Sequence, residues 1–472
     1  MPQEHFLRDL SNLVDFSFVY EKVEHLYSSV GRPAVDPVVL VKSLLLGFIY
    51  GIDSERKIEK EIQVNIAYRW FLGVDLDERV PDHSTISQTR RRKFNSTNLF
   101  EDLFKEVVKK CMDVGLVDGS LILTDSTHIK ANASSKRKEF VTVEIEPSEY
   151  VRKLDKICEE EDLKVRAEKI ERGLKKCSFP MNTAPKTKTI VQSTTDPDCG
   201  NLARPGKPEG FHYLSHQSTC GKSGIITDVY VTPANVNDHT PYVERIKHQK
   251  ESLGLDIKEV GIDKGYDTNE IHSELLDMGI KTYTPLNDNE NKKGRTVFPP
   301  SAFQYNPCND SYTCPNGETL NFVSVNKNKH TKVYCVSQKI CKGCKLKSQC
   351  IGGKEPKRKL EIRLFQFKAD IQRANYGTKR YYEVQRLRRV YAEGNFALQK
   401  DNHNLRKTRK RGNKKVSEHC LMSAMALNLK RLVKYMKTNP SFSEITQLFS
   451  YKRNPNIKTG FKSQSFKSCF YF

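Results

Sequence analysis

Two aspartates follow short apolar runs at places where the sequence predicts that strands end. Asp125 comes after Leu121–Leu123, and Asp263 comes after Val260-Gly261-Ile262. In an α/β sheet, carboxylates at the carboxyl ends of neighbouring strands point into the crevice where ligands bind. Two such groups can share one or two Mg²⁺ ions, which prefer oxygen ligands and keep several waters. The pattern therefore predicts a divalent-cation site that acts on phosphate.

A third carboxylate that could complete this site lies in a later helical stretch. Glu393 follows Arg389 by four residues and precedes Lys400 by seven, so we expect the three side chains on one helical face. Glu393 would bind metal while Arg389 and Lys400 hold phosphates, which suits two-metal phosphoryl transfer. The alternative is structural, because an aspartate at a strand end often forms a turn or caps a helix.

Six cysteines gather between Asp263 and Glu393, and one pair has CxxC spacing. Such clusters favour a structural Zn²⁺ site, which would fold a small module with little core of its own. The alternative is a variable insertion whose cysteines are reduced and bind nothing, since a second CxxC is missing. The expected ligands are Cys314, Cys341, Cys344 and Cys350, with Cys335 or Cys308 as substitutes.

A dense basic run directly follows the helical stretch that carries Glu393. Its position predicts contact with the phosphates of nucleic acid and salt-dependent binding, although basic runs are often merely solvated. A second, weaker candidate is Arg90–Lys93, at the end of a short helix that resembles part of a helix-turn-helix. A plain helical bundle with a basic helix end would explain that segment equally well. The cations of the main run are Arg406, Lys407, Arg409, Lys410, Arg411, Lys414 and Lys415.

The composition favours a polyanionic partner. Of 472 residues, 79 are Lys or Arg and 57 are Asp or Glu, which gives a net charge of +22. Nucleic acid leads as the partner class, ahead of an anionic membrane surface. The most apolar stretch, Val38–Tyr50, is interrupted by Lys42 and is too short to span a bilayer, so we expect no membrane partner. No signal-like segment opens the sequence, which predicts a cytoplasmic protein with reduced cysteines.

The elements that must position these residues change in type along the chain. Residues 1–115 are predicted to form a helical domain, in which Asp36-Pro37 starts a buried helix and Asp82–Ser84 caps a basic one. Residues 116–290 predict an α/β sheet of mixed strand directions, with a charged helical insertion at about 136–190. The remaining segments are the cysteine-rich insertion (291–360), a helical part that carries Glu393 (361–440) and a basic tail (441–472).

These motifs together resemble the DDE transposases of bacterial insertion sequences, in the subgroup with a cysteine-containing insertion before the glutamate. The matching motifs are Thr124-Asp125-Ser126-Thr127, Ile262–Asp267 and Arg389-x3-Glu393-x6-Lys400. The family's third motif usually has a Tyr three residues before the Arg; here that position is Arg386, and Tyr382 lies one turn earlier. Further landmarks are Gly31–Ala34, Asn65–Gly73, Pro81–Ser87, Ser193–Asp198 and Thr232–Asp238.

The resemblance implies an RNase H-like, mixed-sheet α/β catalytic core, with an N-terminal all-α domain and an inserted zinc-ribbon-like subdomain. It implies that Asp125, Asp263 and Glu393 bind two Mg²⁺ or Mn²⁺ ions. The protein would cleave double-stranded DNA at the element's terminal inverted repeats and join the freed 3′ hydroxyl to target DNA. Synapsis of two ends implies a homo-oligomer on DNA, at the nucleoid of a bacterial cytoplasm. The alternatives are a non-catalytic DNA-binding protein derived from a transposase, and a nuclease that never joins ends.

Overall fold

The computed structural model divides the chain into two compact units. The first comprises Met1–Glu139, Val191–Gly261 and Glu383–Phe472, and the second comprises Phe140–Ile190 and Ile262–Tyr382. No helix in the described parts is both long and apolar enough to cross a membrane. The predicted basic tail, 441–472, lies outside the described residues. These run from 2 to 439, apart from 3, 29–33, 145–146, 148, 172–186, 204–205, 207, 288–296 and 353–354.

Helices open the first unit, and two of them begin where the sequence predicts. Asp36 accepts hydrogen bonds from the N–H groups of Val38 and Val39, with Pro37 at the first helical position. Asp82 accepts from the N–H of Ser84 at the start of the basic helix. Both predicted helix starts are therefore confirmed. The helices are α1 (Phe6–Leu13), α2 (Phe18–Val23), α3 (Pro37–Ile49), α4 (Glu55–Val64), α5 (Ile66–Leu72), α6 (His83–Arg92) and α7 (Leu99–Asp113).

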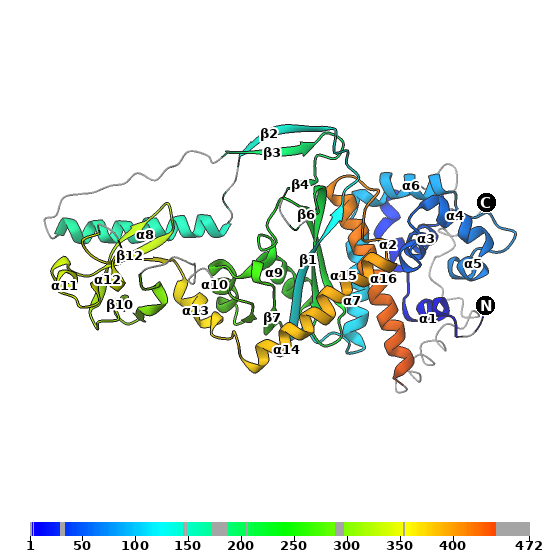
Figure 1. Ribbon diagram of the computed structural model, residues 1–472. Helices are drawn as coiled ribbons and strands as arrows, with labels where there is room; N and C mark the ends of the chain where they lie inside the picture. The colour runs from blue at the N-terminus through cyan, green and yellow to red at the C-terminus, as the bar shows by residue number, and fades with distance from the viewer. Residues whose placement is uncertain are drawn as a thin grey trace. The chain divides into compact units, whose positions relative to one another are not determined.

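A sheet of mixed strand directions follows, as the sequence predicts (Figure 1). β1 pairs antiparallel with β5 and parallel with β7, while β4 and β6 pair antiparallel with β5. The helix α9 connects β6 to β7 in sequence. The bounds are β1 (Leu121–Lys130), β4 (Gly200–Leu202), β5 (Gly210–Cys220), β6 (Ile226–Pro233), α9 (Tyr242–Leu253) and β7 (Glu259–Gly261).

β1 is longer than the sequence predicts, so Asp125 lies within the strand. Pairing with β5 continues from Ile122 opposite Cys220 to Lys130 opposite His212. The prediction that the strand ends at Asp125 is wrong, because β5 supplies hydrogen-bond partners along the whole of β1. The side chain of Asp125 consequently belongs to one face of a continuous strand.

The helical region that follows is broken where the sequence suggests one long stretch. The break precedes α14 at Gly377, whose φ of +75° is readily adopted only by glycine. α14 then passes into η5, a single π-helical turn, before α15 begins. The bounds are α14 (Lys379–Arg388), η5 (Arg389–Glu393), α15 (Gly394–Asn402) and α16 (Asn413–Thr438).

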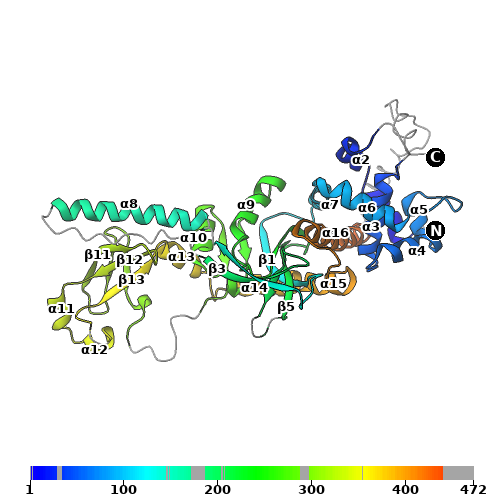
Figure 2. The same ribbon diagram turned by 90° about the horizontal axis from the view of Figure 1, so that it is seen from above.

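One apolar core joins the helices and the sheet of the first unit. It includes Leu45 and Phe71 from the helices, Phe211 from β5 and Met425 from α16. α16 packs against α3, α7, α15 and β6, and Figure 2 shows it running beside α7 and α15. The helical part and the sheet of this unit therefore share their hydrophobic stabilisation.

The second unit has a sheet and a core of its own. Its strands follow the order β13-β12-β11-β10-β9, all antiparallel, and α8 packs along β11 (Figure 2). Tyr312, Leu320, Tyr334 and Leu360 are buried together in a small core that is separate from that of the first unit. The bounds are α8 (Glu149–Glu171), α10 (Asn269–Asp277), β8 (Lys281–Tyr283), β9 (Gln304–Asn306), β10 (Ser311–Thr313), β11 (Thr319–Asn326), β12 (Thr331–Cys335), α11 (Gln338–Lys342), α12 (Lys347–Cys350), β13 (Lys359–Arg363) and α13 (Gln366–Arg373). β2 (Lys138–Glu144) and β3 (Thr187–Ser193) pair as a separate two-stranded sheet.

Two buried histidines fasten the segment after α15 to the rest of the first unit. The ring Nδ1 of His403 lies 2.7 Å from the carbonyl oxygen of Phe48, and Nε2 of His419 lies 2.9 Å from that of Asn404. A ring nitrogen that faces a carbonyl oxygen must donate its proton. Burial lowers the pKa of His403 to about 4 and that of His419 to about 3. Both rings are therefore neutral in the folded protein at neutral pH.

We expect acid to destabilise the first unit through these histidines. Because their folded pKa values lie below the ordinary value of 6.5, the unfolded chain binds the protons first, and stability falls as pH drops from about 6.5 towards 4. The loss should be about 2–3 kcal/mol per histidine, measured by urea unfolding at a series of pH values. The double variant His403→Gln, His419→Gln should show a shallower decline, and an unchanged decline would contradict the assignment.

Candidate functional site

Two of the three predicted acids meet at one arginine. Arg388 Nη1 donates to Oδ2 of Asp125 at 3.0 Å, and its Nη2 donates to Oε1 of Glu393 at 2.9 Å. Arg388 is only 8% exposed, whereas the side chain of Glu393 is 48% exposed. A cation between two carboxylates offsets their mutual repulsion. Asp125 on β1 and Glu393 on η5 therefore belong to one site in the first unit.

The π-helical turn explains why the bridging residue is Arg388 and not Arg389. In a π-turn, hydrogen bonds span five residues, so the residue five positions before Glu393 shares its face. The α-helical spacing of the sequence prediction placed Arg389 there, but Arg389 is exposed. Sequence reasoning missed Arg388, because the sequence carries no local signal for the extra residue in the turn.

Buried amides hold α15, and with it Glu393, against β5. Gln399 and Gln217 exchange two side-chain hydrogen bonds of 2.7 and 3.1 Å. Asn395 Nδ2 donates to the hydroxyl of Thr219 and to the carbonyl of Gly224. Because these groups are almost fully buried, loss of one partner would leave an unsatisfied polar atom. The amides thus fix which face of α15 meets the sheet.

Asp263 lies in the second unit, just past the end of β7. It occupies the N-cap position of the short 3₁₀ turn η3 (Lys264–Tyr266), but its side chain makes no cap hydrogen bond. β1 and β7 run parallel, with Leu123 opposite Gly261. Asp125 lies two residues after Leu123, and Asp263 lies two residues after Gly261.

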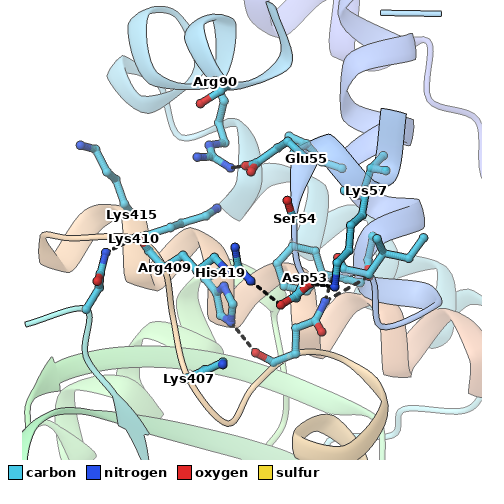
Figure 3. Close-up of a pocket in the computed structure, with 18 of the residues that line it drawn as sticks. Asp53, Ser54, Glu55, Lys57, Arg90, Lys407, Arg409, Lys410, Lys415 and His419 are labelled. Atoms are coloured by element: carbon cyan, nitrogen blue, oxygen red, sulfur yellow. Dashed lines mark hydrogen bonds and ion pairs between the residues drawn. The ribbon is translucent and has the colours of Figure 1, made fainter. Parts of the chain in front are cut away.

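A cationic cleft of about 840 Å³ lies in the first unit between the α3–α4 region and the segment after α15 (Figure 3). We call residues 403–412 the basic loop. Ten basic side chains line the cleft against the two acids Asp53 and Glu55. Among them, Lys57, Arg90 and Arg91 come from the helical part, so the weaker sequence candidate and the main basic run share one surface. The others are Lys400, Arg406, Lys407, Arg409, Lys410, Arg411 and Lys415.

The basic loop is held in place by the strand that carries Asp125. Lys130, at the end of β1, donates its N–H to the carbonyl of Arg406 and accepts from the N–H of Thr408 at 3.0 Å. Asn404 Nδ2 donates to the carbonyls of Gly47 and Ile52. These bonds place the loop against both β1 and the end of α3.

The cations of the loop differ in their access to solvent. The side chain of Lys410 is 10% exposed, and its Nζ donates to Oε1 of Glu418 at 2.5 Å, so its charge is already neutralised. Burial lowers the pKa of Lys410. Arg406 and Arg409 are well exposed, although each pairs with an aspartate. Lys410 lines the cleft as well, but its ion pair links the loop to α16, whereas Arg406 and Arg409 are exposed.

Lys400 connects the cleft to the acid pair. Lys400 lies on α15, the helix that begins directly after Glu393, and it lines the cleft. Burial and the nearby charge of Arg406 lower the pKa of Lys400, while the charge of Asp125 opposes that shift. The charge of Asp125 thus reaches a side chain that lines the cleft.

Four of the predicted zinc ligands line a single small cavity in the second unit. Cys314, Cys341, Cys344 and Cys350 surround a space of about 30 Å³. No three of their sulfur atoms lie within 4.8 Å of one another among the described residues, so the thiols converge without forming a tight cluster. Neighbouring thiols add to burial in raising the pKa of Cys350. Cys308, one of the proposed substitutes, is exposed.

Comparison with known proteins gives two family matches. Residues 1–92 match a transposase domain, and residues 313–433 match a transposase DDE domain. Among curated proteins, none matches the chain. A solved structure of a piggyBac transposase synaptic complex with hairpin DNA aligns with 98% of this chain and 84% of its own, at 8% identity and a TM-score of 0.37. The second family match includes Arg388, Glu393 and Lys400, and both matches support the resemblance of this chain to the DDE transposases.

Proposed function

We propose that this protein is a divalent-metal-dependent DNA transposase. It cleaves double-stranded DNA at the ends of its element and transfers the freed 3′ hydroxyl to target DNA. The observation that carries the proposal is the meeting of Asp125 and Glu393 at Arg388, in the unit that also holds the cationic cleft. The mixed sheet with β1 at its centre supports an RNase H-like core.

Asp125, Glu393 and Asp263 are the proposed metal ligands. Carboxylate oxygens suit Mg²⁺ or Mn²⁺, and two side chains that already share one cation are a fitting donor set. Bound ions would activate the attacking water or hydroxyl and stabilise the leaving oxygen. The equal offset of Asp125 and Asp263 from a paired position of β1 and β7 supports Asp263 as the third acid.

The cleft is the proposed path of the DNA backbone. Arg406, Lys407, Arg409 and Arg411 line it and are proposed phosphate contacts, for which Arg406 and Arg409 would leave their exposed aspartate partners. Lys400, which also lines the cleft, and Arg389, which is exposed on η5, are further proposed contacts. Lys410, which the sequence also suggested, would act by fixing the loop because its charge is paired with Glu418. Two element ends must be brought together, so we propose a homo-oligomer on DNA, in a bacterial cytoplasm.

The alternative function is a DNA-binding protein that has lost transposition. The presence of all three acids speaks against decay, since a binding-only protein has no use for a metal site. A nuclease that never joins ends would be distinguished by a strand-transfer assay with a pre-cut 3′ hydroxyl.

We expect Asp125→Asn, Asp263→Asn and Glu393→Gln each to lower cleavage of DNA carrying the element's end by at least about 100-fold, because metal charge stabilisation is worth several kcal/mol in the transition state. DNA binding should change little. The assay is cleavage of labelled DNA with Mg²⁺ or EDTA, with Glu251→Gln on α9 as an exposed-acid control. A variant that cuts at the wild-type rate would remove that residue from the site.

Neutralising the cleft should weaken DNA binding and its salt dependence. For the double variant Arg406→Gln, Lys407→Gln, we expect the slope of log K against log salt to become shallower by about one to two, since each lost phosphate contact removes about 0.9. Fluorescence anisotropy between low and moderate salt measures this slope. Lys109→Gln on α7, outside the cleft, is the control, and equal slopes for both variants would place the DNA elsewhere.

The cysteine cavity is the proposed site of one structural Zn²⁺. Four thiols around a shared space are a suitable donor set, because soft thiolates select zinc. We expect elemental analysis of protein purified without chelators to give one zinc per chain. Cys344→Ser should lose most of it, and Cys308→Ser, which alters an exposed thiol, should keep it. Wild-type protein without stoichiometric zinc would refute this proposal.

A further inference from the structure

We propose that Arg388 is a built-in counter-ion for the catalytic carboxylates: it holds Asp125 and Glu393 together in the metal-free protein and competes with metal for their oxygens. This inference rests on the proposed function, because it takes these two acids as metal ligands. It assigns Arg388 a role as a positioning residue that sets the affinity for the divalent cation.

The guanidinium is fixed from several directions. Its two Nη atoms each bond one carboxylate, and its Nε donates to Oε1 of Gln385 at 3.2 Å. The side chain is 10% exposed and that of Asp125 is 18% exposed, so the ion pair between Arg388 and Asp125 is poorly screened by solvent. A planar guanidinium can hold two acids at once, which the single ammonium of a lysine does with less directional precision.

Three of the four carboxylate oxygens of Asp125 and Glu393 accept hydrogen bonds. Asp125 Oδ2 is held by Arg388, and its Oδ1 accepts the N–H of Ser126 at 2.8 Å. The oxygen of Glu393 that faces Arg388 is Oε1. Arginine does not lose its proton in proteins, so a metal ion that takes Asp125 Oδ2 and Glu393 Oε1 as ligands meets the positive charge of the guanidinium on the same oxygens. The protein and the ion therefore compete for the same ligands.

The competition has a consequence for affinity. When a competing state occupies the ligands, the apparent dissociation constant rises by the inverse of the fraction that is open. If Arg388 holds the acids nine-tenths of the time, metal binds about tenfold more weakly than to the open site. The same contact relieves repulsion between the two acids, so its removal should lower the stability of the metal-free protein.

The test uses the full chain without DNA and measures Mn²⁺ binding by isothermal titration calorimetry. We expect Arg388→Gln to bind Mn²⁺ about tenfold more tightly than wild type. In EDTA, the same variant should melt at a lower temperature than wild type. Saturating Mn²⁺ should remove this difference in melting temperature. Arg386→Gln, an exposed arginine on the same helix, is the matched control and should behave as wild type in both measurements.

Failure of this inference is distinguishable from failure of the proposed function. If Asp125→Asn abolishes Mn²⁺ binding but Arg388→Gln binds no more tightly than wild type, the counter-ion role is overturned and the metal site stands. If Asp125→Asn leaves Mn²⁺ binding unchanged, the metal site itself is wrong and both proposals fall. Should Arg388→Gln not fold, Arg388→Lys keeps the charge but loses the two-pronged contact, and it must then show an intermediate gain in affinity.

Discussion

The structure of the first unit depends on α16, a helix whose central residues are buried on every side. Every residue of α16 from Met422 to Leu429 is buried, because α3, α7, α15 and β6 all pack on this helix. A buried polar side chain in this position costs free energy unless it finds a hydrogen-bond partner. Asn428 meets the demand by bonding both the N–H and the carbonyl of Ile226 at the start of β6. The sheet and the helical part are thereby both fixed to α16.

The rest of the site follows from that arrangement. α15 packs on α16, and the basic loop between them is bound to the end of α3 by Asn404 and to α16 by the Lys410–Glu418 pair. The loop in turn continues the hydrogen bonding of β1, which carries Asp125. Acid pair and cleft are therefore built from the same few segments, although they are far apart in sequence.

Much of the local structure could be predicted from the sequence, because caps and periodicity act over a few residues. Asp36-Pro37 and Asp82 mark their helices correctly. The grouping of the basic run with Arg90 and Arg91 on one surface could not be predicted, because it depends on the tertiary fold. The position of Asp125 within β1 could not be predicted, since it depends on the length of β5. The burial of Lys410 depends on Glu418, a partner that composition does not reveal.

The π-turn η5 lets the consecutive helices α14 and α15 pack on two different surfaces. Before the turn, Val384 packs so closely on Gly261 that an added Cβ there would lie 2.5 Å from Val384 Cγ1. After the turn, Asn395 and Gln399 fit against β5. Each residue turns the direction of the side chains around an α-helix by about 100°. Without the extra residue, Val384 and the two amides could not both face their present partners. Deletion of a single residue in this turn would thus rotate the two amides away from the sheet. Such a deletion would disturb the structure more than most substitutions along the same helix.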